Sequence, residues 1–152
     1  MESVLITGAS GFIGSFIVEE ALKRRFGVWA GIRSTSSKKY LKNRKIHFQQ
    51  REVKDLSHPK KYGFIITNPP YGERLEEKEA LPKLYKEFGD AFKNLDSWSA
   101  YMITSYEEAE RYFGRKADKN RKIYNGMLRT YFYQFQGPRP PRKTVREQGM
   151  AL

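Results

Sequence analysis

Short apolar runs alternate with apolar residues at helical spacing along most of the chain. The runs predict five buried strands, at residues 3–7, 28–32, 46–48, 63–67 and 100–104. Helical spacing predicts helices over about residues 12–25, 81–95 and 106–113, and a short helix is expected around 38–43. Strands and helices in this alternating order are typical of a parallel sheet with helices on both faces.

The C-terminal part of the chain predicts a β-hairpin. Ile123 and Tyr124 precede the pair Asn125-Gly126, which two-residue type I′ turns prefer, and an aromatic-rich run follows over 127–135. This hairpin would add an antiparallel strand to the sheet. We therefore expect an α/β, doubly wound, Rossmann-like fold, with residues 1–137 as one domain and 138–152 as a basic Pro/Arg tail that frays.

Composition narrows the class of protein. The 152 residues are the size of one domain, and 39% apolar with 14% aromatic residues argue against disorder. No cysteine is present, which excludes disulfides, thiolate zinc sites and a catalytic thiol, and two histidines disfavour a His-rich metal site. No apolar run suits a signal peptide or a membrane span, so a cytoplasmic protein without a membrane partner or a metal is expected.

The net charge of +12 is unevenly distributed. Residues 34–62 carry a net charge of +7 and residues 111–152 one of +9, whereas residues 63–110 carry −5. Two basic blocks around an acidic middle suit an anionic ligand such as RNA, and they equally suit solvated faces that keep a protein in solution. Charge alone leaves both interpretations open.

The first turn reads TGASGFIG over residues 7–14, between a predicted strand and a predicted helix. Glycines there permit a tight turn and a close approach of the backbone to a pyrophosphate at the helix N-terminus. The alternative is that these glycines serve only helix–sheet packing. The candidate cofactor-binding residues of this turn are Thr7, Gly8, Ser10, Gly11, Phe12, Ile13 and Gly14.

With this turn, residues 1 to about 48 resemble the extended short-chain dehydrogenase/reductase family, the NAD(P)-dependent epimerases and dehydratases. The resemblance implies NADP as cofactor, because Arg33 and the neighbouring Ser34 stand where a guanidinium would pair with the 2′-phosphate. The family also needs a Tyr-x-x-x-Lys pair on a helix. Tyr112 and Lys116 have that spacing, but Gly114 lies between them at a predicted helix end, so we treat the match as chance.

A second motif follows the fourth predicted strand. It consists of Asn68, Pro69, Pro70 and Tyr71, and residues 51 to about 141 around it resemble the catalytic domain of the ribosomal-RNA large-subunit guanine-N2 methyltransferases. Segments 67–75, 113–118 and 121–126 carry the resemblance. It implies S-adenosylmethionine as cofactor, with acceptor oxygens of Asn68 and a proline binding the target amine and Tyr71 stacking on the base. The alternative is an Asn-Pro-Pro turn without further function.

Those methyltransferases carry an acidic residue in or near the first glycine-rich loop and another after the second strand, whereas this chain has no acid in the loop and an arginine at position 33. Our leading interpretation is therefore an engineered chimera joined at 45–55. It would have a seven-stranded sheet of order 3-2-1-4-5-7-6 with strand seven antiparallel, no complete active site, and at most residual binding of NADP or S-adenosylmethionine.

Three alternatives to the chimera remain open. The first is a fragment of an S-adenosylmethionine-dependent rRNA guanine-N2 methyltransferase, which is the activity expected if the chain is an enzyme at all. The second is an RNA-binding module that uses the basic segments, and the third is a fragment of an NADP-dependent reductase. Oligomeric state is left open by the sequence.

Overall fold

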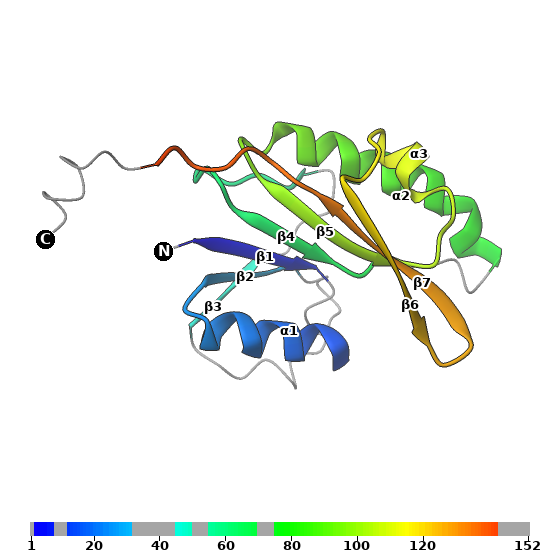
Figure 1. Cartoon of the computed structure of the whole chain (residues 1–152), viewed down its shortest axis with the longest axis horizontal. Coiled ribbons are helices and arrows are strands. Elements are labelled where there is room, and N and C mark those ends of the chain that lie inside the picture. The colour runs from blue at the N-terminus through cyan, green and yellow to red at the C-terminus, as the bar shows by residue number, and fades with distance from the viewer. Residues whose placement is uncertain (1, 8–11, 32–44, 50–54, 70–74, 143–152) are drawn as a thin grey trace, which may run out of the picture.

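Seven strands form one mixed sheet in the computed structural model, which describes residues 2–7, 12–31, 45–49, 55–69 and 75–142. Figure 1 shows the sheet with α1 on one face and with α2 and α3 on the other. The elements, in chain order, are β1 (Ser3–Thr7), α1 (Phe12–Lys23), β2 (Gly27–Gly31), β3 (Ile46–Gln49), β4 (Phe64–Thr67), α2 (Leu75–Asn94), β5 (Ser99–Thr104), α3 (Ala109–Phe113), β6 (Lys119–Asn125) and β7 (Leu128–Phe135).

The strand order is β3-β2-β1-β4-β5-β7-β6. Strands β1 to β5 are all parallel to one another, whereas β7 is antiparallel to both β5 and β6. The predicted fold class, strand number, strand order and antiparallel seventh strand are confirmed.

Alternating side chains of the central strands divide the core into two layers. Val4 and Ile6 of β1 pack on the α1 side with Val18, while Leu5 joins the larger cluster under α2 and α3. Successive side chains of a strand point to opposite faces, so a strand covered on both sides needs a continuous apolar run. That requirement explains why the strand predictions from short apolar runs agree with β1, β2, β4 and β5.

Helix boundaries differ more from the predictions. Helix α2 begins at Leu75, several residues before the predicted start, because residues 75–80 are mostly good helix formers that lack an apolar period. Helix α3 begins only at Ala109, whose N–H donates to the carbonyl of Tyr106 across a turn. The helix expected around 38–43 lies outside the described residues.

The hairpin has a different turn from the one predicted. Asn125 pairs with Leu128, which places Gly126 and Met127 in the two-residue loop and Asn125 in the strand. Gly126 has a φ of 64° and is the first central residue, the position that glycine takes in type II′ turns. The prediction of a type I′ turn centred on Asn125-Gly126 was therefore wrong by one residue, although the predicted hairpin itself is confirmed.

Tyr133 in β7 should make the stability of the fold depend on pH in the alkaline range. Its side chain is 3% exposed, and burial, followed by the nearby Glu110, raises its pKa from 10.0 to about 12. In the unfolded chain the phenol ionises at lower pH than in the folded protein, so the stability from keeping it protonated is lost as pH rises from about 10 to about 12. We expect the free energy of unfolding, measured with urea across this range, to fall less steeply in Tyr133→Phe. Parallel curves for the two proteins would contradict this.

Candidate functional site

The carboxyl ends of β1 and β4 are neighbours at the point where the strand order reverses. Strand β1 pairs with β2 on one side and with β4 on the other, and the chain leaves β1 for α1 but leaves β4 for α2, on opposite faces. Ligands of open α/β sheets bind in the crevice at such a switch point. The geometry thus selects this edge as the candidate site.

A hydroxyl pair joins the two strand ends. The Oγ1 atoms of Thr7 and Thr67 lie 2.5 Å apart in a hydrogen bond, with Thr67 buried and Thr7 half-buried. The bond ties the first residue of the glycine-rich segment to the residue immediately before Asn68. Segments 60 residues apart in sequence therefore meet at one edge.

Asn68 and Pro69 follow β4 directly, and both are half-buried. Their position at the carboxyl end of β4 is the one that the Asn-Pro-Pro-Tyr motif predicts for a target-binding turn. Pro70 and Tyr71, the remainder of the predicted catalytic set, lie outside the described residues.

The predicted cofactor residues are described only in part. Phe12, Ile13 and Gly14 form the first turn of α1, and Gly14 is buried. The residues that would contact a pyrophosphate or a 2′-phosphate lie outside the described part of the chain, namely Gly8, Ser10, Gly11, Arg33 and Ser34. Their assignment stays a prediction.

A buried network at the end of β5 was missed by the sequence interpretation. The Tyr85 hydroxyl of α2 lies 2.6 Å from Oγ1 of the fully buried Thr104, and the N–H of Tyr106 donates to the same oxygen at 3.0 Å. The Tyr106 ring lies 4.9 Å from that of Tyr85, and burial raises the pKa of Tyr106. The network holds a third strand end at the same edge. Its one sequence signal is a tyrosine among the apolar positions of α2.

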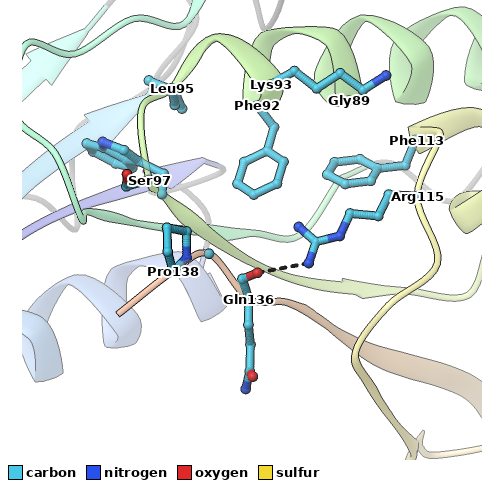
Figure 2. A pocket seen from close by; sticks show the side chains of 11 residues that line it. Gly89, Phe92, Lys93, Leu95, Ser97, Phe113, Arg115, Gln136 and Pro138 are labelled. Carbon is cyan, nitrogen blue, oxygen red and sulfur yellow. Dashed lines mark hydrogen bonds between the residues drawn. The ribbon is translucent and has the colours of Figure 1, made fainter. Parts of the chain in front are cut away.

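A cavity of about 250 Å³ lies at the opposite edge of the sheet. It is lined by the C-terminal part of α2, by Trp98 just before β5 and by Gly137 just after β7. Figure 2 shows Phe92 and Phe113 on its lining. Ala100 at the start of β5 pairs with Phe135 at the end of β7, which places these lining residues at the amino end of β5, away from Thr7 and Asn68. Arg115 closes one side through a hydrogen bond from Nη2 to the Gln136 carbonyl at 2.8 Å. This cavity is therefore separate from the candidate site.

The Tyr-x-x-x-Lys spacing has no helix to support it. Helix α3 ends at Phe113, and Gly114 caps it with a left-handed φ of 84°. Tyr112 stacks on Tyr106, while Lys116 is exposed beyond the helix end. The two side chains accordingly do not share a helix face, as expected for a chance match. Within the described ranges, no helix combines the length and apolarity that crossing a membrane requires.

A Rossmann-like sheet with an Asn-Pro turn after β4 is the architecture of a class of methyltransferases. A family model for the RMKL-like methyltransferase domain matches residues 32–134. The match covers more than half of the chain, and the chain belongs to this family.

Named relatives agree with that membership. YpsC of Bacillus subtilis (strain 168), a proposed RNA methyltransferase, is 52% identical over 99 residues, which are 64% of this chain and 26% of YpsC. Ribosomal RNA large subunit methyltransferase K/L of Shewanella baltica (strain OS185) is 39% identical over 88 residues, 57% of this chain and 12% of that protein. This chain thus aligns with only a fraction of each relative.

Solved structures extend the similarity over nearly the whole chain. A candidate methylase from Clostridium difficile 630 has a TM-score of 0.70 and 34% identity, covering 93% of this chain and 50% of that one. SMU.472, a proposed methyltransferase solved with S-adenosylhomocysteine, has a TM-score of 0.73 and 26% identity, covering 92% of this chain and 49% of its own.

These matches do not support the chimera. The family match begins at residue 32, inside the segment assigned to a reductase-like half, so the boundary at 45–55 is not supported. The methylase structure covers 93% of the chain and therefore most of residues 1–31. The reductase resemblance of the first segment has no counterpart in the matches described above, and the methyltransferase alternative replaces the leading interpretation.

Proposed function

We propose that residues 1–137 form one methyltransferase domain that uses S-adenosylmethionine to methylate an exocyclic amine of an RNA base, of the guanine-N2 type. The observation that carries the proposal is the position of Asn68 and Pro69 immediately after β4, at the switch-point edge that Thr67 ties to Thr7. Family membership supports methyl transfer, and the names of the relatives support RNA as substrate.

Two acceptors of the Asn68 turn would hold the nucleophile. The amide oxygen of Asn68 and the carbonyl of Pro69 accept hydrogen bonds from the target amine, which turns the nitrogen lone pair out of conjugation with the ring. Holding the amine in the attacking orientation supplies rate through proximity and reduced conformational freedom. The half-buried position of both residues also limits competition from water for these acceptors.

The backbone at the end of β1 and at the start of α1 has the arrangement that would hold a nucleoside cofactor. Thr7 ends β1 at the switch point, and α1 starts at Phe12, so the helix N-terminus faces the same edge as Asn68. S-adenosylmethionine, when bound, supplies an electrophilic methyl group on sulfur. The sequence departs from the family pattern at two places: residues 7–14 contain no acid, and Arg33 stands where an acid would accept hydrogen bonds from the ribose hydroxyls.

Two experiments test the proposal. Isothermal titration with S-adenosylmethionine and, separately, with NADP measures which cofactor the chain binds. Incubation with methyl-labelled S-adenosylmethionine and unmodified large-subunit ribosomal RNA measures transfer, and we expect label in guanine. Binding of NADP alone, or RNA that stays unlabelled, would refute the proposal.

The charge at position 33 should control the choice of cofactor. In Arg33→Asp a carboxylate replaces the guanidinium two residues after the end of β2, and a hydrogen bond to a charged group is worth about 1.5–3 kcal/mol. We expect S-adenosylmethionine to bind about tenfold more tightly and NADP more weakly, as measured by titration calorimetry. Lys60→Asp, which makes the same charge change at an exposed residue before β4, should leave both affinities unchanged. Equal effects of the two variants would show that net charge, and not the position, is responsible.

A further inference from the structure

The β6–β7 hairpin extends beyond the edge that holds the candidate site. Thr67 pairs with Met102, and Met102 pairs with Tyr133, so Tyr133 marks the level of the site on β7. The loop residues Gly126 and Met127 lie six or more residues further along β7. Figure 1 shows the β6–β7 hairpin extending past the ends of β4 and β5. At about 3.4 Å per residue, and two strand spacings of about 4.8 Å to the side, the loop is roughly 20 Å from Asn68.

One face of the hairpin alternates cations and aromatic rings. In the antiparallel register Lys122 is opposite Tyr131 and Tyr124 is opposite Arg129, and these four residues share a face because they are paired and two apart along each strand. The Arg129 guanidinium lies 5.8 Å from the Tyr131 ring centre. We call these four residues the hairpin face.

The opposite side of the same hairpin presents a different set of residues. Arg121 and Ile123 of β6 point to the other side of the sheet and pair with Phe132 and Thr130. The Phe132 ring stacks on Tyr101 of β5 at 6.1 Å, and the Thr130 hydroxyl donates to the Ile123 carbonyl at 2.7 Å. These contacts stabilise the hairpin on the side opposite to the hairpin face, so the hairpin face is carried by an ordered pair of strands.

Most of the positive charge on the hairpin has no ion pair within the described residues. Residues 119–129 contain four cations and no acid. Arg129 approaches Glu107 at 3.7 Å, while in the described part of the chain Lys122 has no ion pair. A cluster with more cations than acids is the surface that a polyanion favours.

The aromatic and apolar side chains of the hairpin are unusually exposed. Tyr124 is 67% exposed, and Met127 in the loop is fully exposed at 103%. A protein gains no stability from leaving a large aromatic ring in water, but such a ring next to cations is what sequence-tolerant binding of single-stranded nucleic acid requires. Charge complementarity therefore selects RNA as the occupant over an apolar protein partner.

We infer that the hairpin face binds the single-stranded RNA next to the target base, with Tyr124 stacking on a base and with Lys122 and Arg129 at phosphates. The inference rests on the proposed function, which places the target amine at Asn68. The hairpin face lies between the level of the site and the loop of the hairpin, so it is less than roughly 20 Å from Asn68, and the RNA that it binds would be only a few nucleotides from the target base. The hairpin would thus determine which stretch of RNA presents its base to the site.

The test compares substitutions on the two faces of the hairpin. Fluorescence anisotropy measures binding of the whole chain to a labelled single-stranded RNA of about 16 nucleotides over a range of salt concentrations. Lys122→Gln should reduce the slope of log K against log salt by about 0.7. Arg121→Gln removes the same charge from the opposite face and should change the slope by less than half of that. Equal changes would overturn the inference.

The stacking part of the inference is tested on the adjacent pair of residues. We expect Tyr124→Ala to weaken RNA binding about tenfold and Tyr124→Trp to retain it, because stacking needs only a flat ring. Ile123→Ala, on the other face, should change binding less than twofold. Wild-type affinity in Tyr124→Ala would overturn the inference. Sedimentation gives a second check. If Tyr124→Ala lost self-association but kept its RNA affinity, the hairpin face would bind a second copy of the chain, and the inference would be overturned.

Methyl transfer separates failure of this inference from failure of the proposed function. RNA binding that depends on Lys122 and Tyr124, with no label transferred to any RNA, supports the inference and refutes the proposed function. Label transferred at equal rates by wild type and Tyr124→Ala, with equal RNA affinity, refutes the inference and supports the proposed function.

Discussion

Replacing Asn68 with alanine should lower methyl transfer to RNA by at least about a hundredfold while leaving the fold intact. Loss of one hydrogen-bonding group that acts on the reacting atoms costs about a hundredfold to a thousandfold in other enzymes. Asn68 follows β4 outside the ladders that β4 forms with β1 and β5, so its replacement leaves those strand pairings in place. The measurement is single-turnover transfer of labelled methyl, with the thermal midpoint as a check of folding.

Two control variants show whether a loss of activity in Asn68→Ala comes from the missing acceptor oxygen. Asn68→Asp keeps an acceptor oxygen and should retain more activity than Asn68→Ala, because the amine needs acceptors. Asn94→Ala, at the exposed end of α2, should behave like wild type. Full activity in Asn68→Ala would place the target amine elsewhere on the molecule.

Phe113→Ala should destabilise the fold by about 3–5 kcal/mol. Phe113 is 2% exposed at the end of α3, with its ring centre 4.1 Å from that of Phe135 and 5.5 Å from that of Phe92. The backbone is also close here, since a Cβ added at Gly89 would clash with the Phe113 carbonyl oxygen. A cavity left by alanine could close only if α2 and α3 moved, and urea denaturation measures the cost.

Tyr124→Ala is the control for that cavity. It also removes a large ring, but from a residue that is 67% exposed, so we expect a change in unfolding free energy within about 0.5 kcal/mol. A small effect of Phe113→Ala, comparable to that of Tyr124→Ala, would mean that the α2–α3 layer is loosely packed.

The order of the elements could be predicted because each central strand is covered on both faces. Burial on both faces requires an apolar run such as residues 63–67, and that run is visible without any knowledge of its neighbours. The sheet order needed more, namely the family resemblance carried by the turn after Thr67. The hairpin turn was wrong by one residue because an isolated Asn-Gly pair does not specify which strand residues face each other.

Parts of the candidate site could also be predicted from the sequence, whereas other parts could not. The Asn-Pro-Pro-Tyr motif identified Asn68 from sequence, since proline stops a buried strand at a defined residue. The Tyr85–Thr104 network and the cavity near Trp98 were not predicted, because they join side chains from elements whose relative position is a property of packing. The reductase-like interpretation of the first segment came from a glycine-rich turn that unrelated nucleotide-binding folds share.

Sequence alone determined the alternation of strands and helices, the hairpin, the uneven charge and the position of Asn68 at a strand end. These features are local, because a buried strand, a proline stop and a run of lysines each depend on residues close together in the chain. Tertiary structure alone decided that the hydroxyls of Thr7 and Thr67 form a hydrogen bond and that the cavity lies at the opposite edge from the site. It also decided that Lys122 and Tyr124 share a face with Arg129 and Tyr131. Those facts depend on the register between strands, which long-range pairing establishes and a single segment does not encode.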